Sequence, residues 1–322
     1  MKVVDLIQGS DQWHAWRKLG VSASDAAVFM NTSPYKTPWR LWAEKTQRVE
    51  PPDLSDNFFV KRGHALEPAA RAKMEALLDD LLIPLCAESS EHSVIRASFD
   101  GLSSQGFPVE LKVPSPKTWQ DVIEQKEHSK AYQLYFYQVQ YQIYVAEAQQ
   151  GYLCFYHEGQ IKVFLIRRDE ELISQLVKKA SAFWQAVQTD VAPERDPERD
   201  IALLHGVQSE YVSEYCFYAE KLAALKKTVK AYELAQKGCL TELEKGMGNN
   251  KIADFGGLTL TRSMAKGAID YKKIVETLLP QLSDDQLNQY RKLGSEKLLP
   301  KVNKAALVQS RPHFNEPFSA YF

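Results

Sequence analysis

The sequence predicts a mixed α/β protein in which a central sheet carries helices on its faces. Helical patterns come first, and strand-like runs follow at 94–102 and 109–113. A helix then precedes a second pair of strand-like runs. Alternation of this kind is typical of a sheet covered by helices, and 322 residues are enough to bury a full core.

Helix-start signals mark the N-terminal third. Ser10 is a suitable N-cap for a helix over 11–18, and Thr37 before Pro38 predicts a helix that runs to about Thr46. Residues 50–56 are predicted as a loop. A further helix is expected over 64–82, with a core stripe of Leu66, Ala70, Leu77 and Leu81.

Ser22-Ala-Ser24-Asp25 has the form of a capping box and precedes a short apolar run. A helix start exposes backbone N–H groups and favours a phosphate, and Arg17 lies just before it. From these residues alone, a purely structural cap with Arg17 as a surface charge is the alternative interpretation.

The stretch from Asp100 to Lys112 places three charges in two short apolar runs. If 109–113 is a strand, alternation puts Glu110 and Lys112 on one face, with Val109 on the other. An adjacent strand would bring Asp100 to the same patch. Two carboxylates and a lysine are typical of metal-assisted phosphodiester cleavage, although charged strand faces are also common on protein surfaces.

The next segments complete the predicted core. Residues 130–148 are predicted as an aromatic helix that contains Gln138 and Gln142 one turn apart. A glutamine among aromatic residues needs hydrogen-bond partners, and it can reach into a polar site. Strands are predicted over 151–156 and 161–167, and a helix capped by Asp169 over 170–189.

Composition indicates a soluble protein without a strongly basic surface. The net charge is −1, so a polyanionic substrate must be met by a local basic patch. The four cysteines are far apart and are interpreted as buried thiols of a reducing cytoplasm. The N-terminus shows no signal-peptide pattern, and no apolar run is long enough to span a bilayer. We therefore expect a cytoplasmic protein.

A repeated Pro-Glu-Arg-Asp marks a change of composition at 192–200. The predicted organisation is a core over 1–192, a linker over 193–207 and a mainly helical region over 208–322. The last region contains a long helix from 208 to 245, a hairpin over 252–261 and two short helices around 271–279 and 283–293.

Five short motifs follow one another between Trp13 and Tyr141. They are Trp13-x-x-x-Arg17 with Val21-Ser-Ala-Ser24, Arg62-Gly63 with Leu66-Glu67-Pro-Ala-Ala-Arg71, Ser98-Phe-Asp100-Gly101, Glu110-Leu-Lys112-Val-Pro114, and Tyr135-x-x-Gln138-Val-Gln140-Tyr141. In this order they resemble the lambda-type phage exonucleases, or YqaJ-like viral recombinases, a branch of the PD-(D/E)XK nuclease superfamily with a restriction-endonuclease-like core. Phe99 stands where the superfamily has proline, which leaves the aspartate in place.

The resemblance implies a metal-dependent cutting site. Asp100, Glu110 and the carbonyl of Leu111 would bind Mg²⁺, with two ions in the active complex and Mn²⁺ as a substitute. Lys112 would polarise the attacking water, and Glu67 would support the metal or its waters.

The resemblance also implies how the DNA is held. Gln138 would orient water or the scissile phosphate. Arg17, Ser24 and Ser98 would form a pocket for a terminal 5′-phosphate, which suits a guanidinium and two hydroxyls.

The activity that the resemblance implies is a 5′→3′ exonuclease on double-stranded DNA ends. It would release 5′-mononucleotides and leave 3′ single strands for recombination with a single-strand annealing protein. A homotrimeric ring is the implied assembly, encoded by a phage, a prophage or the bacterial host. A nuclease of other polarity, an endonuclease and an inactive DNA-end-binding subunit remain as alternatives.

Overall fold

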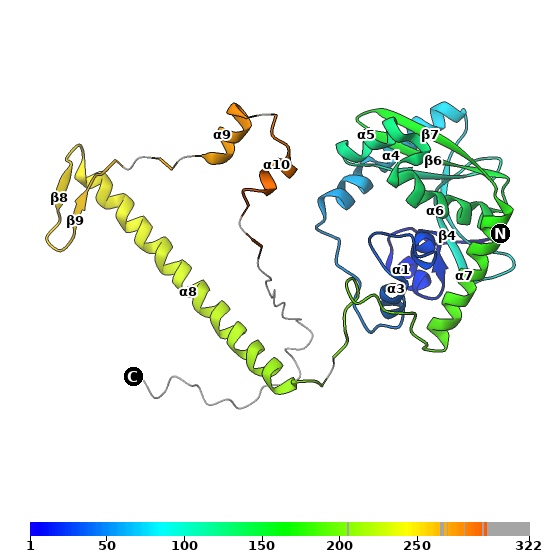
Figure 1. Cartoon of the computed structure of the whole chain (residues 1–322), viewed down its shortest axis with the longest axis horizontal. Helices are drawn as coiled ribbons and strands as arrows, with labels where there is room; N and C mark the ends of the chain where they lie inside the picture. The colour runs from blue at the N-terminus through cyan, green and yellow to red at the C-terminus, as the bar shows by residue number, and fades with distance from the viewer. Residues whose placement is uncertain (205, 265–266, 269, 280, 292, 295–322) are drawn as a thin grey trace. The chain divides into compact units, whose positions relative to one another are not determined.

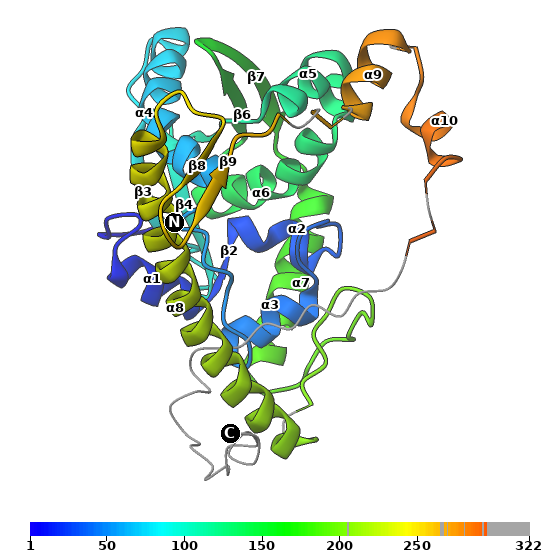
Figure 2. The same cartoon turned by 90° about the vertical axis from the view of Figure 1, so that its left-hand side faces the viewer.

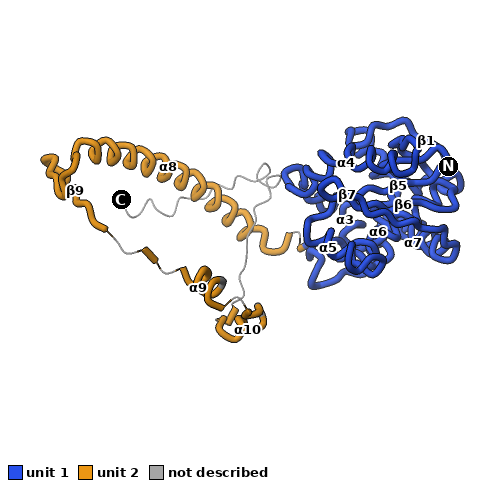
Figure 3. Tube along the Cα trace, turned by 90° about the horizontal axis from the view of Figure 1, so that it is seen from above, with its two compact units in different colours: residues 1–203 blue, residues 204–322 orange. Residues whose placement is uncertain are grey.

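A computed structural model describes residues 1–204, 206–264, 267–268, 270–279, 281–291 and 293–294 (Figure 1). The chain divides into two compact units, Met1–Leu203 and Leu204–Phe322 (Figure 3). The boundary falls within the segment 193–207 that composition predicts as a linker.

A mixed sheet of seven strands, counted over the described residues, forms the centre of the first unit. Its order is β1-β3-β4-β5-β6-β7, with β2 paired to β4. The β2–β4 and β5–β6 pairs are parallel and the others antiparallel. This arrangement confirms the predicted α/β class. The strands are β1 Lys2–Val4, β2 Val21–Ser22, β3 Ile83–Glu88, β4 Ile95–Leu102, β5 Pro108–Lys112, β6 Gln150–His157 and β7 Gln160–Arg167.

Helices cover the sheet, and several begin where the sequence predicts. Ser10 Oγ accepts from Trp13 N at 3.2 Å, and Thr37 Oγ1 accepts from Arg40 N at 2.9 Å, so both predicted caps are confirmed. The helices of this unit are α1 Asp11–Lys18, η1 Ala23–Asp25, α2 Ala26–Phe29, α3 Pro38–Lys45, α4 Phe58–Leu78, α5 Pro116–Gln125, η2 Lys126–His128, α6 Lys130–Ala146 and α7 Glu170–Gln188.

The prediction for the fourth helix was wrong in its bounds and in its buried stripe. Asn57 caps α4 early, and the helix ends at Asp79, which adopts a left-handed conformation at φ 50°. Strand β3, which the sequence did not predict, follows at once. Leu77 and Leu81 are 58% and 73% exposed, because Ala70 and Met74, one turn apart, form the face that packs against the sheet.

Strand β5 is covered on both faces, which is why the charged side chain of Glu110 is buried. Val109 and Leu111 pack in one cluster with Ala70 and Met74 of α4, as alternation predicts. Helix α6 packs across β4, β5 and β6 (Figure 2). Glu110 alternates with the apolar positions and meets α6, so its carboxylate is removed from solvent.

Two buried side chains of α6 tie distant segments to the core. The hydroxyl of Tyr141 donates to Val21 O at 2.8 Å and so fixes strand β2. Gln140 Nε2 donates to Arg167 O at 2.8 Å, and its Oε1 accepts from Asp169 N at 3.1 Å. These bonds satisfy polar groups that would otherwise be unpaired in the core.

The segment after α7 packs back on the first unit. Asp200 is 7% exposed and accepts a hydrogen bond from the Thr37 hydroxyl. Arg199 Nη2 donates to Ser33 O at 2.9 Å. These contacts explain why the compact unit extends to Leu203.

The second unit has the predicted elements, with a shorter last helix. Its elements are α8 Ser209–Met247, β8 Ile252–Asp254, β9 Thr259–Thr261, α9 Tyr271–Leu278 and α10 Asp284–Asn288. The last ten residues lie outside the described residues. No helix in the described part of the chain is long and apolar enough to cross a membrane.

The cysteine interpretation needs correction. Cys86 and Cys154 are buried free thiols as expected, but Cys216 is half-buried and Cys239 is exposed. Both departures lie in α8, whose apolar positions are largely open to solvent.

Candidate active site

A cleft of about 440 Å³ in the first unit brings together side chains from distant parts of the chain. Of the predicted site residues, Glu110 alone is absent from its lining; it is 2% exposed and contacts the lining residue Lys112. The lining residues are Gln8, Trp13, Arg17, Ser22, Ala23, Ser24, Val60, Gly63, His64, Glu67, Ser98, Asp100, Leu111, Lys112, Val113, Tyr135 and Gln138.

Asp100 and Glu110 form a carboxylate pair where β4 and β5 separate. Gly101 pairs with Val109, so Asp100 and Glu110 come next on the two strands. The N–H of Leu111 donates to Asp100 Oδ2 at 2.8 Å. Burial, together with the negative charge of Glu110, raises the pKa of Asp100 to about 8. The pair therefore carries a repulsion that a bound cation would relieve.

Each oxygen of Glu110 has its own partner. Oε1 forms an ion pair with Lys112 Nζ, and Oε2 accepts from Gln142 Nε2 at 2.6 Å. Gln142 is fully buried, its Nε2 also reaches Ser98 O at 3.3 Å, and its Oε1 has no hydrogen-bond partner. The orientation of the Glu110 carboxylate is thus set by one cation and one amide.

Lys112 is held as an ammonium. Burial opposes its charged form, but attraction to Glu110, Tyr135 and Asp100 outweighs burial and raises the pKa of Lys112 above its usual value. Its Nζ lies 4.5 Å from the centroid of the Tyr135 ring. Tyr135 was noted in the sequence as part of the aromatic helix and of the fifth motif, with no role assigned, and it lines the cleft.

Glu67 enters the cleft from α4 and is paired there. Arg71 Nη2 donates to Glu67 Oε1 at 2.5 Å, one turn away, as the i,i+4 spacing predicts. Arg71 Nε also donates to Asp100 O at 2.8 Å. Arg71 therefore links Glu67 to the backbone of the carboxylate pair.

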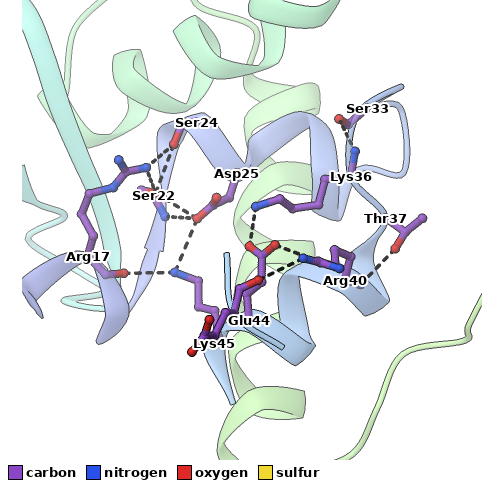
Figure 4. A network of polar contacts seen from close by, with 11 residues as sticks. Arg17, Ser22, Ser24, Asp25, Ser33, Lys36, Thr37, Arg40, Glu44 and Lys45 are labelled. Atoms are coloured by element: carbon purple, nitrogen blue, oxygen red, sulfur yellow. Dashed lines mark hydrogen bonds and ion pairs between the residues drawn. The ribbon is translucent and has the colours of Figure 1, made fainter. Parts of the chain in front are cut away.

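At the other end of the cleft, Arg17 points to two hydroxyls. Its Nη2 donates to Ser22 Oγ at 3.0 Å and to Ser24 Oγ at 2.5 Å (Figure 4). The helices that begin here are only three and four residues long, so these side chains, more than a helix dipole, would attract an anion.

Asp25 and Lys45 support Arg17 from below the surface. Ser22 N donates to Asp25 Oδ2 at 3.1 Å, as the predicted capping box requires, and Ser22 Oγ donates to the same oxygen at 2.9 Å. Burial opposes ionisation of Asp25, but the charges of Lys45 and Arg17 outweigh it and hold the pKa of Asp25 below its usual value. Lys45 Nζ donates to Arg17 O at 3.0 Å and forms an ion pair with Asp25. Since Arg17 and Lys45 are cations and Asp25 is an anion, the three residues together carry one net positive charge.

Trp13 connects Ser98 to Arg17. Its Nε1 donates to Ser98 Oγ at 2.8 Å, while the guanidinium of Arg17 stacks 4.5 Å from the centroid of its ring. Ser98 therefore lies beside Arg17 without contacting it directly. The structure brings the predicted group Arg17, Ser24 and Ser98 to one end of the cleft.

A divalent cation fits the acidic end. Asp100 and Glu110 would supply carboxylate oxygens and Leu111 a carbonyl, and hard cations bind oxygen. The raised pKa of Asp100 is the observation that favours a cation here. Glu67 does not complete a three-acid group, since among the described residues no three His, Cys, Asp or Glu side chains gather to hold a metal.

Three residues of the site were missed as functional. Gln142 was noted in the sequence as a glutamine one turn from Gln138 in the aromatic helix. Its contact with Glu110 could not be predicted without knowing which strands lie beneath that helix. Trp13 was noted only as part of a motif. Ser22 was interpreted as a cap, and it also accepts from Arg17.

Comparison with known proteins agrees with the motifs. Residues 12–149 match the model of the YqaJ-like viral recombinase domain. The chain is similar to the uncharacterised protein YqaJ of Bacillus subtilis (strain 168), with 25% identity over 290 residues, 82% of this chain and 86% of that protein.

The fold is similar to that of solved structures. An alkaline exonuclease (LHK-Exo) from Laribacter hongkongensis matches at a TM-score of 0.50 and 23% identity, over 56% of this chain and 94% of that one. The same enzyme in complex with dAMP matches equally well. At this identity the likeness shows the fold alone. Together with the domain match, these findings confirm the resemblance of residues 12–149 to the YqaJ-like viral recombinase domain.

Proposed function

We propose that this chain is a Mg²⁺-dependent exonuclease that degrades double-stranded DNA in the 5′→3′ direction and releases 5′-mononucleotides. One observation carries the proposal. A single cleft is lined by Asp100 and Lys112, with Glu110 in contact with Lys112 behind the lining, and also by the guanidinium of Arg17 with the hydroxyls of three serines. A site for a cation beside a site for an anion suits the cutting of a phosphodiester next to a terminal phosphate.

The acidic end would cut. Asp100, Glu110 and the Leu111 carbonyl would hold the metal, which supplies a water nucleophile at neutral pH and neutralises charge on the phosphate. Lys112, as an ammonium, would donate to the attacking water or to a phosphate oxygen. Gln138 lines the same cleft and would orient that water, and Glu67 would hold waters around the metal.

The basic end would select the DNA end. Arg17 would bind the 5′-phosphate dianion with two parallel N–H donors, and the Ser24 hydroxyl is already within 2.5 Å of its guanidinium. Ser98 would donate its hydroxyl proton to the same phosphate while accepting from Trp13. A phosphate fixed here would set the first scissile bond over the acidic end, which gives the cut its direction.

We place the activity in recombination, where the 3′ single strand that remains would be passed to a single-strand annealing protein. The domain match to viral recombinases supports this role. We also propose a homotrimeric ring, because a chain of net charge −1 gains little from bulk attraction to DNA and would be retained better by encircling it. A phage, prophage or bacterial host cytoplasm is the proposed setting.

Digestion of linear duplexes tests the proposal. Substrates with 5′-phosphate or 5′-hydroxyl ends, labelled on either strand, would be incubated with Mg²⁺, with Mn²⁺ and with chelator. We expect metal-dependent loss of the 5′ strand, faster from phosphorylated ends, with mononucleotide products. Equal digestion of 5′-phosphorylated and 5′-hydroxyl ends would contradict the assignment of the phosphate pocket. Degradation that begins at the 3′ end of a strand would contradict the proposed 5′→3′ direction.

Circular substrates and native mass test the remaining parts. A closed circular duplex cut as fast as a linear one would identify an endonuclease. Binding of DNA ends with no cleavage under any metal would identify an inactive subunit. A ring of three chains should appear in the native mass.

A further inference from the structure

Helix α8 carries an apolar seam that follows a strict heptad repeat. From Tyr211 to Leu243 its members are separated alternately by four and three residues, which is the period of a left-handed coiled coil. We call these ten positions the α8 seam: Tyr211, Tyr215, Tyr218, Leu222, Leu225, Val229, Tyr232, Gln236, Cys239 and Leu243.

The α8 seam is largely open to solvent. Leu225 and Tyr232 are 61% and 73% exposed, and Leu222 and Val229 are more than half exposed. The helix has 39 residues and is therefore about 58 Å long. The seam itself spans about 48 Å and is interrupted only by Gln236. An apolar stripe of that length marks an interaction surface, because a helix of this kind gains its stability mainly by burying one face.

We propose that α8 pairs antiparallel with α8 of a second copy of this chain, centred between Lys230 and Ala231. In this register, Leu222 meets Cys239 of the second copy. Val229 meets Tyr232 of the second copy at the centre. Each of these layers occurs twice, and each combines a larger with a smaller side chain, as close packing requires.

The positions that flank the seam agree with this register. Lys226 lies beside Glu233 of the second copy, and Lys221 lies beside Glu242 of the second copy, so four ion pairs of opposite charge form. Glu242 pairs with Lys245 of its own helix through a solvent-exposed contact, which is readily exchanged.

The uncharged flanks are matched as well. Ala219 lies beside Leu240 of the second copy, and this pair occurs twice. In the central part of the helix, an apolar flanking position therefore meets an apolar one, and Lys221, Lys226, Glu233 and Glu242 meet opposite charges.

Other registers bring like charges together. A parallel in-register pair sets Lys221 beside Lys226 of the second copy. An antiparallel pair shifted by one heptad in one direction sets Lys226 beside Lys226 of the second copy. A shift in the other direction sets Glu233 beside Glu233 of the second copy. Like charges at these positions oppose association, so the flanking residues select one pairing.

The proposed pairing is independent of nuclease activity. It joins the chains in pairs. If the chains form the proposed trimeric rings, each pair would connect a chain of one ring with a chain of another ring. Cross-linking within α8 detects the pair whatever other contacts the chains make.

Cysteine cross-linking of the full chain tests the register. Under mild oxidation, Leu222→Cys should give a covalent dimer on a non-reducing gel, through the native Cys239 of the second copy. The dimer should disappear when Cys239→Ala is added. Ala223→Cys, one residue away on the outer face, is the matched control and should remain monomeric.

The unmodified chain provides the opposing test. Antiparallel pairing separates the two Cys239 side chains by about 25 Å along the axis, so oxidation should give no dimer. A dimer of the unmodified chain through Cys239 would indicate a parallel pair and overturn the proposal. Equal monomer content for Leu222→Cys and Ala223→Cys would also overturn it.

A charge exchange tests the flanking pairs by sedimentation of the full chain over a range of concentrations. Lys226→Glu should weaken association about tenfold, since two attractive pairs become repulsive. Addition of Glu233→Lys should restore it, because each pair is then reversed but complementary. Failure of the double variant to recover would refute the register.

Discussion

The two ends of the cleft are built in opposite ways. At the acidic end, the carboxyl groups of Asp100 and Glu110 lie beside one ammonium, that of Lys112, and Glu110 is 2% exposed. At the basic end, Arg17 and Lys45 outweigh Asp25, and the bond between Arg17 and Ser24 is solvent-exposed. Two adjacent carboxyl groups suit a small cation, whereas an exposed positive group suits a phosphate on a large substrate.

The contrast teaches that the ends should fail in different ways. Damage to the acidic end should stop the chemical step without releasing DNA. Damage to the basic end should weaken the preference for one kind of DNA end without stopping cleavage. The following variants separate these outcomes.

Removal of Lys112 should have the largest effect. We expect Lys112→Ala to lower the single-turnover cleavage rate about a thousandfold, since a positioned donor is lost from the site of charge development. DNA-end affinity, measured by fluorescence anisotropy, should change less than threefold. Lys162→Ala is the matched control, because Lys162 also lies over an aromatic ring, that of Phe164, outside the cleft lining. Full activity of Lys112→Ala would exclude a role for Lys112 in cleavage.

Loss of the guanidinium should affect one substrate only. Arg17→Gln should lower kcat/KM about thirtyfold on 5′-phosphorylated ends, the equivalent of a charged hydrogen-bond pair, and leave 5′-hydroxyl ends within threefold. Arg48→Gln serves as control, since Arg48 is also stacked on a tryptophan, Trp42, and lies outside the cleft lining. A uniform loss on both substrates would mean that Arg17 supports the fold and not the phosphate.

The buried amide should tune the metal. We expect Gln142→Met to weaken Mn²⁺ binding about tenfold by calorimetry, because one oxygen of Glu110 loses its donor. Gln140→Met removes an equally buried glutamine of α6 that holds Arg167 and Asp169 instead. It should lower thermal stability and leave metal affinity unchanged. Identical metal affinity in both variants would show that Gln142 serves packing only.

The smallest effect concerns stability in chelator. The pKa of Asp100 is raised to about 8, so the folded state binds a proton more tightly than the unfolded one. Stability from this group is present below pH 4 and lost as the pH rises to about 8. Asp100→Asn should therefore raise Tm at pH 8 by a few degrees and leave it nearly unchanged at pH 4. A lower Tm for the variant at pH 8 would contradict the raised pKa.

Local signals in the sequence predicted most of the helices and the site strands. Three helices were predicted from their N-cap residues Ser10, Thr37 and Asp169, and the cap hydrogen bonds are present. Alternation in 109–113 put Glu110 and Lys112 on one face. Strand β3 was missed because its six residues follow a long helix without a turn signal that distinguishes them.

Partners across the sheet were beyond local patterns. Gln142 meets Glu110 only because α6 crosses β5, and Trp13 meets Ser98 only because α1 lies beside β4. Leu77 was predicted to be buried, and it is exposed. The helix period alone does not show which face of α4 packs against the sheet, and that face is the one with Ala70 and Met74.

The bond from Gln142 to Glu110 spans 32 residues, whereas the bond from Trp13 to Ser98 spans 85. Closing the longer loop costs more chain entropy. The carboxylate pair and its partner Gln142 thus come from the single segment 100–142, and the basic end must wait for the N-terminus to dock. During synthesis and folding, we expect the capacity to bind a cation to arise before the capacity to recognise a DNA end.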